Sequence, residues 1–145
     1  MKVRPSVAII ENNQVLLMRY EYGGERVFNL PGGNVDPGET LSQTLKRELI
    51  EELGITIELG PMLLSGEVIL PQQKTDVLHC VFAAHIMKGI PVLNPAETSA
   101  LAIEWLSVDQ LDTVEMYPNV GATLQKIIAQ QQAGQYIGQI NQKWH

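Results

Sequence analysis

The feature that most constrains this 145-residue chain is a stripe of leucines between a helix-start signal and a helix-stop signal. From Leu41 to Leu53 a leucine recurs at every fourth residue, which places them on one face of an α-helix. Thr40 and Gln43 have the spacing of a capping box, in which each side chain bonds a backbone amide of the other. Gly54 follows the last leucine and is typical of a helix end. The pattern predicts a helix over residues 41–53 with a buried leucine face.

Three carboxylates share one side of the same predicted helix. At about 100° per residue, Glu48, Glu51 and Glu52 occupy an arc of about 100° that borders the leucine stripe. Like charges at this spacing repel each other unless a counter-charge neutralises them. A hard divalent cation with oxygen ligands is one such counter-charge, and a solvated acidic helix face is the alternative. The arc is therefore a candidate metal site at the rim of the core.

The rest of the chain alternates between strand patterns and turn signals, and one further helix is expected. An Asn12-Asn13 turn between two apolar runs indicates a β-hairpin. The order of elements predicts a mixed α/β (α+β) fold, a sheet covered by helices, in one domain over residues 1–145. Residues 133–145 are rich in Gln and Gly and are expected to form a flexible tail. Strands are predicted at residues 3–10, 15–20, 27–30, 55–59, 62–70, 77–87 and 102–108, and the second helix at residues 120–132.

Composition excludes several classes of protein. Ten basic and sixteen acidic residues give a net charge of −6, which argues against binding to polymeric nucleic acid. No apolar run approaches the length of about 20 residues of a membrane span, and the first residues do not read as a signal peptide. The cytoplasm is therefore the expected location. The single cysteine, Cys80, excludes an internal disulfide framework.

The segment Gly33–Ile55, GNVDPGETLSQTLKRELIEELGI, resembles the Nudix box. The preceding Leu-Pro-Gly-Gly at the end of a predicted strand is also similar to a Nudix domain. The resemblance implies an α/β/α sandwich with a loop–helix–loop motif. It also implies hydrolysis of a pyrophosphate bond in a nucleoside diphosphate derivative, with Mg²⁺ or in some members Mn²⁺. The positions that match are Gly33, Glu39, Arg47, Glu48, Leu49, Glu51, Glu52, Gly54 and Ile55.

The resemblance also implies roles for individual residues. The metals would be held by Glu48, Glu51, Glu52 and the backbone carbonyl of Gly32. Family members differ in the residue that takes the proton from the attacking water, and Glu48 and Glu51 are two candidates here. The third candidate comes from a later loop.

Glu97 is that third candidate, and an ordinary loop carboxylate is the alternative reading of it. Arg47 would orient and neutralise the glutamates through charge-assisted hydrogen bonds. Glu39 would brace the loop or bind substrate through water.

Three residues near the loop before the box are candidates for substrate binding. Arg19 and Arg26 carry guanidinium groups that suit phosphates, although either is equally well read as a surface charge. Phe28 has a ring that could stack on a base, and a place in the core is the alternative.

The substrate is less constrained than the reaction. Pro71 lies sixteen residues after Ile55, which resembles the ADP-ribose pyrophosphatase subgroup, although proline is also common in turns. ADP-ribose or a nucleotide sugar is therefore the favoured substrate. The short length fits a nucleoside triphosphate pyrophosphatase of the nucleotide pool, and a non-catalytic nucleotide-binding module is a third reading. Homodimers are common in the family, so a homodimer is also considered.

Overall fold

A computed structural model describes residues 1–71 and 74–143 of the chain. Two α-helices, a short 3₁₀ helix and eight strands are arranged in these residues as the mixed α/β fold expected from the sequence. No helix in the described residues is long and apolar enough to cross a membrane. The elements are β1 (Lys2–Glu11), β2 (Gln14–Tyr22), β3 (Glu25–Asn29), α1 (Leu41–Leu53), β4 (Thr56–Val68), β5 (Val77–Lys88), β6 (Ala102–Ser107), η1 (Val108–Gln110), β7 (Met116–Tyr117), α2 (Gly121–Gln130) and β8 (Gln135–Gln139).

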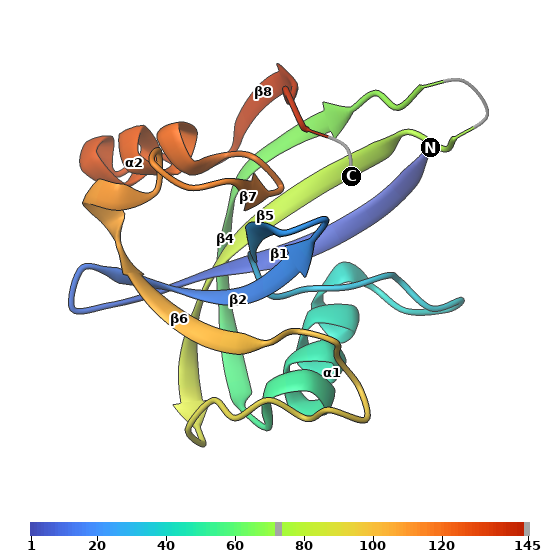
Figure 1. Cartoon of the computed structure of the whole chain (residues 1–145), viewed down its shortest axis with the longest axis vertical. Coiled ribbons are helices and arrows are strands. Elements are labelled where there is room, and N and C mark those ends of the chain that lie inside the picture. Colours follow the sequence, from blue (N-terminus) through green and yellow to red (C-terminus); the bar gives the residue numbers. More distant parts are fainter. Residues whose placement is uncertain (72–73, 144–145) are drawn as a thin grey trace.

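The strands form one sheet in the order β7-β3-β2-β1-β5-β4-β8, and β6 also pairs with β2. Figure 1 shows α1 and α2 on opposite sides of the strands. β1 runs parallel to β5 along most of its length but pairs with β2 only beside the hairpin turn. β1 and β2 therefore separate beyond the hairpin, which leaves one edge of β1 without a partner strand. The segment before α1 lies against that edge.

The predicted helix and its boundaries are confirmed. Thr40 Oγ1 accepts the backbone amide of Gln43, and Gln43 Oε1 accepts the amide of Thr40, which completes the capping box. Gly54 ends the helix in the left-handed region with a φ of 67°. Three of the four leucines of the stripe are fully buried, and they pack with Val7, Ile9, Leu16 and Met18 of β1 and β2. Burial of this face fixes which side of α1 is turned away from the sheet.

The segment between β3 and α1 is held against β1 by the backbone. The amide of Val7 donates to the carbonyl of Pro31 at 2.8 Å, and Ser6 forms an isolated bridge with Gly32. A Cβ on Gly32 would collide with the carbonyl oxygen of Pro5, so only glycine allows this approach. Gly33 of the same Leu-Pro-Gly-Gly sequence lies next to the side chain of Glu48, in the middle of α1.

Two local predictions were wrong. Residues 55–59 and 62–70 form one strand, β4, because irregular pairing with β5 around Leu59 and Met62 accommodates the extra residues without breaking the ladder. The expected flexible tail contains β8, which runs parallel to β4, and Ile140 after it is buried at 4% exposure. The apolar residues of the tail pack into the core around α2, and the Gln- and Gly-rich composition of the tail gives no sign of this packing. The predicted hairpin at Asn12-Asn13 is confirmed.

His79 in β5 predicts a loss of stability in acid. The residue is fully buried, and burial, followed by the nearby positive charge of Arg4, lowers its pKa to about 3 from the usual 6.5. The unfolded chain therefore takes up a proton below pH 6.5 that the folded protein does not take up until about pH 3. The free energy of unfolding should fall by about 2 kcal/mol between pH 7 and pH 5 from this residue alone. Urea titrations of wild type and His79→Leu at both pH values would measure it, and equal acid losses in both proteins would contradict it.

Candidate active site

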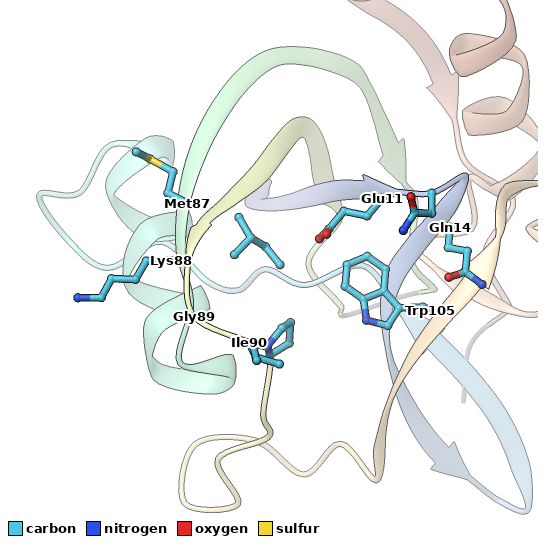
Figure 2. A pocket seen from close by; sticks show the side chains of 10 residues that line it. Glu11, Gln14, Met87, Lys88, Gly89, Ile90 and Trp105 are labelled. Atoms are coloured by element: carbon cyan, nitrogen blue, oxygen red, sulfur yellow. The ribbon is translucent and has the colours of Figure 1, made fainter.

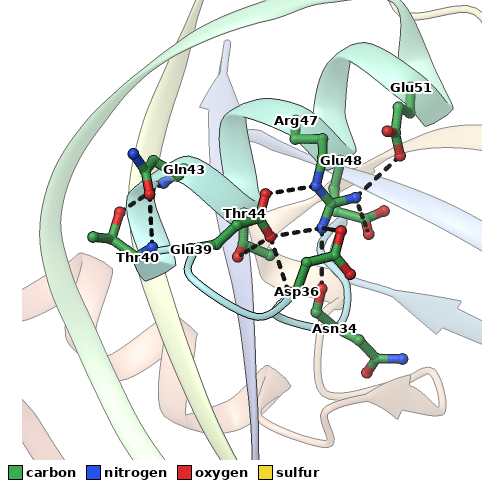
Figure 3. A network of polar contacts seen from close by, with 9 residues as sticks. All are labelled: Asn34, Asp36, Glu39, Thr40, Gln43, Thr44, Arg47, Glu48 and Glu51. Carbon is green, nitrogen blue, oxygen red and sulfur yellow. Dashed lines mark hydrogen bonds and ion pairs between the residues drawn. The ribbon is translucent and has the colours of Figure 1, made fainter.

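Arg47 is the centre of a polar network on the solvent-facing side of α1 (Figure 3). Its Nη1 donates to Glu48 Oε1 at 3.0 Å and to Glu51 Oε2 at 3.1 Å. Its Nη2 reaches the backbone carbonyl of Asn34 at 3.1 Å, and Asp36 lies 3.4 Å away as a further ion-pair partner. One guanidinium thus ties two of the box carboxylates to the loop before the helix.

Glu39 is held by the same guanidinium through two parallel bonds. Arg47 Nε lies 2.7 Å from Oε2, and Nη2 lies 2.9 Å from Oε1. The Thr44 hydroxyl and the Asp36 amide also donate to Oε1. These bonds, with that of Arg47 first, lower the pKa of Glu39 to about 2 from 4.5. The carboxylate therefore links the loop before α1 to the helix.

Glu52 lies among the other carboxylates. Desolvation is the main cause that raises its pKa to about 7 from 4.5, and the negative charges of Glu48, Glu51 and Glu97 add to the effect. Burial likewise raises the pKa of Glu48, although its bond to Arg47 opposes the shift. The acidic side of α1 therefore carries more negative charge than its own cations neutralise.

The loop that carries Glu97 is fastened to the end of α1. The backbone amide of Asn94 donates to the carbonyl of Glu52 at 2.9 Å, and its side chain donates to the carbonyl of Glu51 at 3.2 Å. The amide of Glu97 then closes a turn on Asn94. Glu97 is thereby brought close enough to raise the pKa of Glu52, as a later-loop contribution to the site requires.

Gly33 leaves room for the carboxylate of Glu48. A Cβ at this position would lie 2.5 Å from Glu48 Oε1 and would overlap the carboxyl carbon. Close approach, rather than an unusual backbone conformation, is what requires glycine here, since Gly33 has no positive φ.

Gly33→Ala should therefore displace the Glu48 carboxylate and reduce kcat by about 10- to 100-fold while the fold persists, as when a partner that orients a metal ligand is lost. Steady-state kinetics and thermal melting would measure both quantities. Gly60→Ala is the matched control, because a Cβ there meets Ala83 at an ordinary 3.4 Å. Unchanged kinetics in Gly33→Ala would contradict the packing role.

The three candidates for substrate binding lie in different surroundings. Arg19 is paired with Glu104 of β6 at 3.4 Å, so part of its charge is already neutralised. Arg26 is exposed on β3 opposite Glu21. Phe28 packs against the core cluster beneath α2, which matches the alternative reading of it as a core residue. Phe28 carries no charge, so of these three candidates the two arginines are the ones that could contact a phosphate.

The residue that sequence reasoning missed is Arg4 of β1. It lies close enough to Glu48 and Glu52 for its positive charge to oppose the rise that burial causes in the pKa of both carboxyl groups. Nothing in its sequence context distinguishes it from an N-terminal surface charge. Only the parallel pairing of β1 with β5 and the seating of the loop on β1 bring it to the acidic side of α1.

A hollow of about 500 Å³ near the β1–β2 hairpin is separate from this network (Figure 2). It is lined by the end of β5, by Ile90 and Pro91 of the following loop, and by Trp105 of β6. None of the candidate residues lines it. We therefore place the candidate active site on the acidic side of α1 and not in this hollow.

The donor set fits a divalent cation. Arg47 occupies Oε1 of Glu48 and Oε2 of Glu51, so each carboxylate keeps a second oxygen for a cation. Glu52 is partly buried near three other carboxylates, and Arg4 is the nearby cation that opposes their charge. In the described residues, no three acidic, histidine or cysteine side chains already converge as a metal cage. The fit therefore rests on oxygen chemistry and uncompensated charge, which are the requirements of Mg²⁺ or Mn²⁺.

Comparisons with known proteins agree with this geometry. The family model of the NUDIX domain matches residues 1–131. An oxidized purine nucleoside triphosphate hydrolase of Danio rerio is 30% identical over 119 residues, covering 80% of this chain and 72% of that protein. A putative 8-oxo-dGTP diphosphatase of Bacillus subtilis is 31% identical over 113 residues, covering 78% and 70%. The crystal structure of a MutT NUDIX hydrolase from Burkholderia pseudomallei superposes with a TM-score of 0.72 at 28% identity, covering 86% and 96%.

A Nudix loop–helix–loop on a mixed sheet, with its charged positions linked through one arginine, defines the class of protein. The chain belongs to the Nudix hydrolase family. It is an enzyme of the pyrophosphohydrolase type, and members of this family generally use divalent metal ions.

Proposed function

We propose that the chain hydrolyses a pyrophosphate bond of a small nucleotide with Mg²⁺, and that the acidic side of α1 is where it does so. The observation that carries the proposal is that Arg47 holds Glu48 and Glu51 together on α1 beside the partly buried Glu52, while Asn94 fastens the loop of Glu97 to the same end of the helix. A site that holds repelling carboxylates together at a cost to folding is typical of function.

The residues that would hold the metal are Glu48, Glu51 and Glu52 with the carbonyl of Gly32. When bound, the metal would neutralise charge on the pyrophosphate and make a bound water more acidic. Arg47 keeps the carboxylates in place and stops them from turning to solvent. Glu97 lies beside Glu52 on a separate loop, which suits it to accept a proton from the attacking water, and Glu48 and Glu51 remain the alternatives.

The sequence alone favours ADP-ribose or a nucleotide sugar, but with the relatives taken into account we favour a nucleoside triphosphate as the substrate, with a nucleoside monophosphate and pyrophosphate as products. Two relatives at 30% identity or above are named for oxidised purine nucleoside triphosphates or for 8-oxo-dGTP. ADP-ribose is the second candidate, supported by Pro71 at its subgroup spacing.

A product assay with Mg²⁺ tests the reaction and separates the two substrates. The purified protein is incubated with dGTP, 8-oxo-dGTP, ATP and ADP-ribose, and the products are separated by anion-exchange chromatography. Release of a nucleoside monophosphate and pyrophosphate is the expected result. Release of AMP and ribose 5-phosphate from ADP-ribose alone would replace the favoured substrate with the second candidate. Absence of hydrolysis for all four, with Mg²⁺ or Mn²⁺, would contradict the proposal.

A further inference from the structure

The loop that carries Glu97 is fastened at a second place, on β2. The hydroxyl of Tyr20 lies 2.9 Å from Thr98 Oγ1 and forms a hydrogen bond across 78 positions of the chain. The amide of Ala100 donates to the same Oγ1 at 3.1 Å, which orients the threonine. Figure 1 shows the segment between β5 and β6 passing beside α1. The part of the loop after Glu97 is thus bound to β2, while the part before it is bound to α1 through Asn94.

Tyr20 is itself held in place by its surroundings. Its ring is half-buried and packs against the apolar cluster that buries the leucine face of α1. The ring of Tyr22 stacks on it, with centroids 6.0 Å apart and an angle of 4° between the planes. Next to it, the backbone carbonyl of Arg19 accepts the amide of Leu101 at 2.7 Å. A packed tyrosine ring has little freedom, so its hydroxyl is a fixed anchor for the loop.

Glu97 lies between these two fastenings. The amides of Glu97 and Thr98 both donate to the carbonyl of Asn94, at 2.9 and 3.0 Å, so the three residues form one turn. Asn94 fixes the start of this turn to α1, and Tyr20 fixes its end to β2. Burial raises the pKa of the Tyr20 hydroxyl and the charge of Glu52 adds to the rise, which puts the anchor near the acidic side of α1. An exposed carboxylate is thereby kept close to Glu52.

We propose that Tyr20 is a positioning residue for the hydrolysis, and that its hydroxyl, acting through Thr98, holds Glu97 where it accepts the proton of the attacking water. This inference deepens the proposed function and rests on it, because the role of Glu97 belongs to that proposal. Tyr20 acts through the loop and does not contact the substrate. A loop released from β2 leaves Glu97 in the productive place for less of the time, so the loss appears in kcat.

Removal of the hydrogen bond from either side tests the inference. Tyr20→Phe keeps the ring and should lower kcat by about 3- to 10-fold with KM unchanged, the cost of one neutral hydrogen bond. Thr98→Val should lower kcat at least as much, and the double variant should lose no more than Thr98→Val does. Thr98→Ser returns the hydroxyl and should recover the kcat that Thr98→Val loses. A rise in KM for Tyr20→Phe with unchanged kcat would mean that Tyr20 binds substrate directly, and would overturn the positioning role.

A cycle with Glu97→Gln shows whether Tyr20 acts through Glu97. Glu97→Gln alone should lower kcat by about 100-fold or more, as for the loss of a general base. In that background Tyr20→Phe should cause no further loss, because no proton acceptor is left to position. An unchanged loss from Tyr20→Phe in both backgrounds would overturn the inference. Wild-type kcat in Glu97→Gln would also overturn it, and the hydrolysis would then depend on Glu48 or Glu51.

Two matched variants remove the same kinds of hydroxyl elsewhere. Tyr136→Phe removes a tyrosine hydroxyl that bonds Glu67 at 2.8 Å, on β8 at an edge of the sheet. Thr113→Val removes an exposed threonine hydroxyl that donates to the carbonyl of Gln110 at 2.7 Å. Both should keep the kcat of wild type. A loss in these variants equal to that of Tyr20→Phe would show a general effect of lost hydroxyl groups and would overturn the assignment.

Amide hydrogen exchange measured by NMR tests the fastening without any need for activity. In Tyr20→Phe the amides of Glu97 and Thr98 should exchange about 3- to 10-fold faster than in wild type. If wild type hydrolyses nucleotides while Tyr20→Phe keeps normal kcat and normal exchange, the positioning role is wrong and the proposed function stands. If exchange is faster as expected but wild type hydrolyses nothing, the fastening of the loop by Tyr20 stands, and the hydrolytic function is wrong together with the part of Glu97 in it.

Discussion

Glu52→Gln should lower kcat by about 10³-fold in saturating Mg²⁺ and leave the fold intact. The change keeps the shape of the side chain but removes a charge that a metal needs. Metal ions contribute several kcal/mol to stabilising charge in such reactions, and each 1.36 kcal/mol is tenfold in rate. Single-turnover kinetics would measure the loss directly. Glu58→Gln on β4 is the matched control, because it removes an exposed carboxylate that lies 3.7 Å from the surface residue His85.

The same substitution should stabilise the metal-free protein. The pKa of Glu52 is raised to about 7 in the folded state from 4.5, so the folded protein holds its proton more tightly than the unfolded chain does. Stability from this residue is complete below pH 4.5 and is lost as the pH rises through 7. At pH 8 without metal, Glu52→Gln should therefore melt at a higher temperature than wild type.

Mg²⁺ should reverse that order, because it stabilises the wild type and has little effect on the variant. Melting curves at pH 8 with EDTA and with Mg²⁺ test both statements together. A variant that is less stable than wild type without metal would show that Glu52 serves the fold. Retention of wild-type kcat would remove Glu52 from the site.

Arg47→Lys should lower kcat by about 100-fold and destabilise the protein by about 2 kcal/mol. Lysine keeps the positive charge but has no planar fork, so it cannot hold both oxygens of Glu39 and reach Glu48 and Glu51 at once. The carboxylates should then turn toward solvent, and the loop before α1 should loosen. Kinetics and urea unfolding at pH 7.5 would measure the two effects.

Lys46→Arg is the matched control for this change, since it makes the reverse exchange at the exposed neighbouring position of α1. It should alter neither kcat nor stability. An Arg47→Lys protein with wild-type kcat and reduced stability would limit Arg47 to bracing the loop through Glu39. Wild-type values for both would contradict the network as the support of the site.

The sequence alone determined α1 and most of its chemistry. Helix boundaries are local, because the capping box and Gly54 act through neighbouring backbone groups. The same periodicity that buries the leucines puts Glu48, Glu51 and Glu52 together, so their proximity needs no tertiary information. The partnership of Arg47 with Glu51 follows likewise from its i,i+4 spacing.

Only the tertiary structure decided what surrounds that helix. Arg4 reaches the carboxylates because β1 pairs with β5, and Glu97 reaches them because Asn94 fastens its loop to the end of α1. Both contacts join residues that are far apart in the sequence. The ordered structure of residues 135–140 could not be predicted for the same reason. Ile140 is buried against segments that the local sequence pattern does not identify. Burial sets the pKa of Glu52 and His79, and burial is a property of the packed molecule rather than of the residue or its neighbours in the chain.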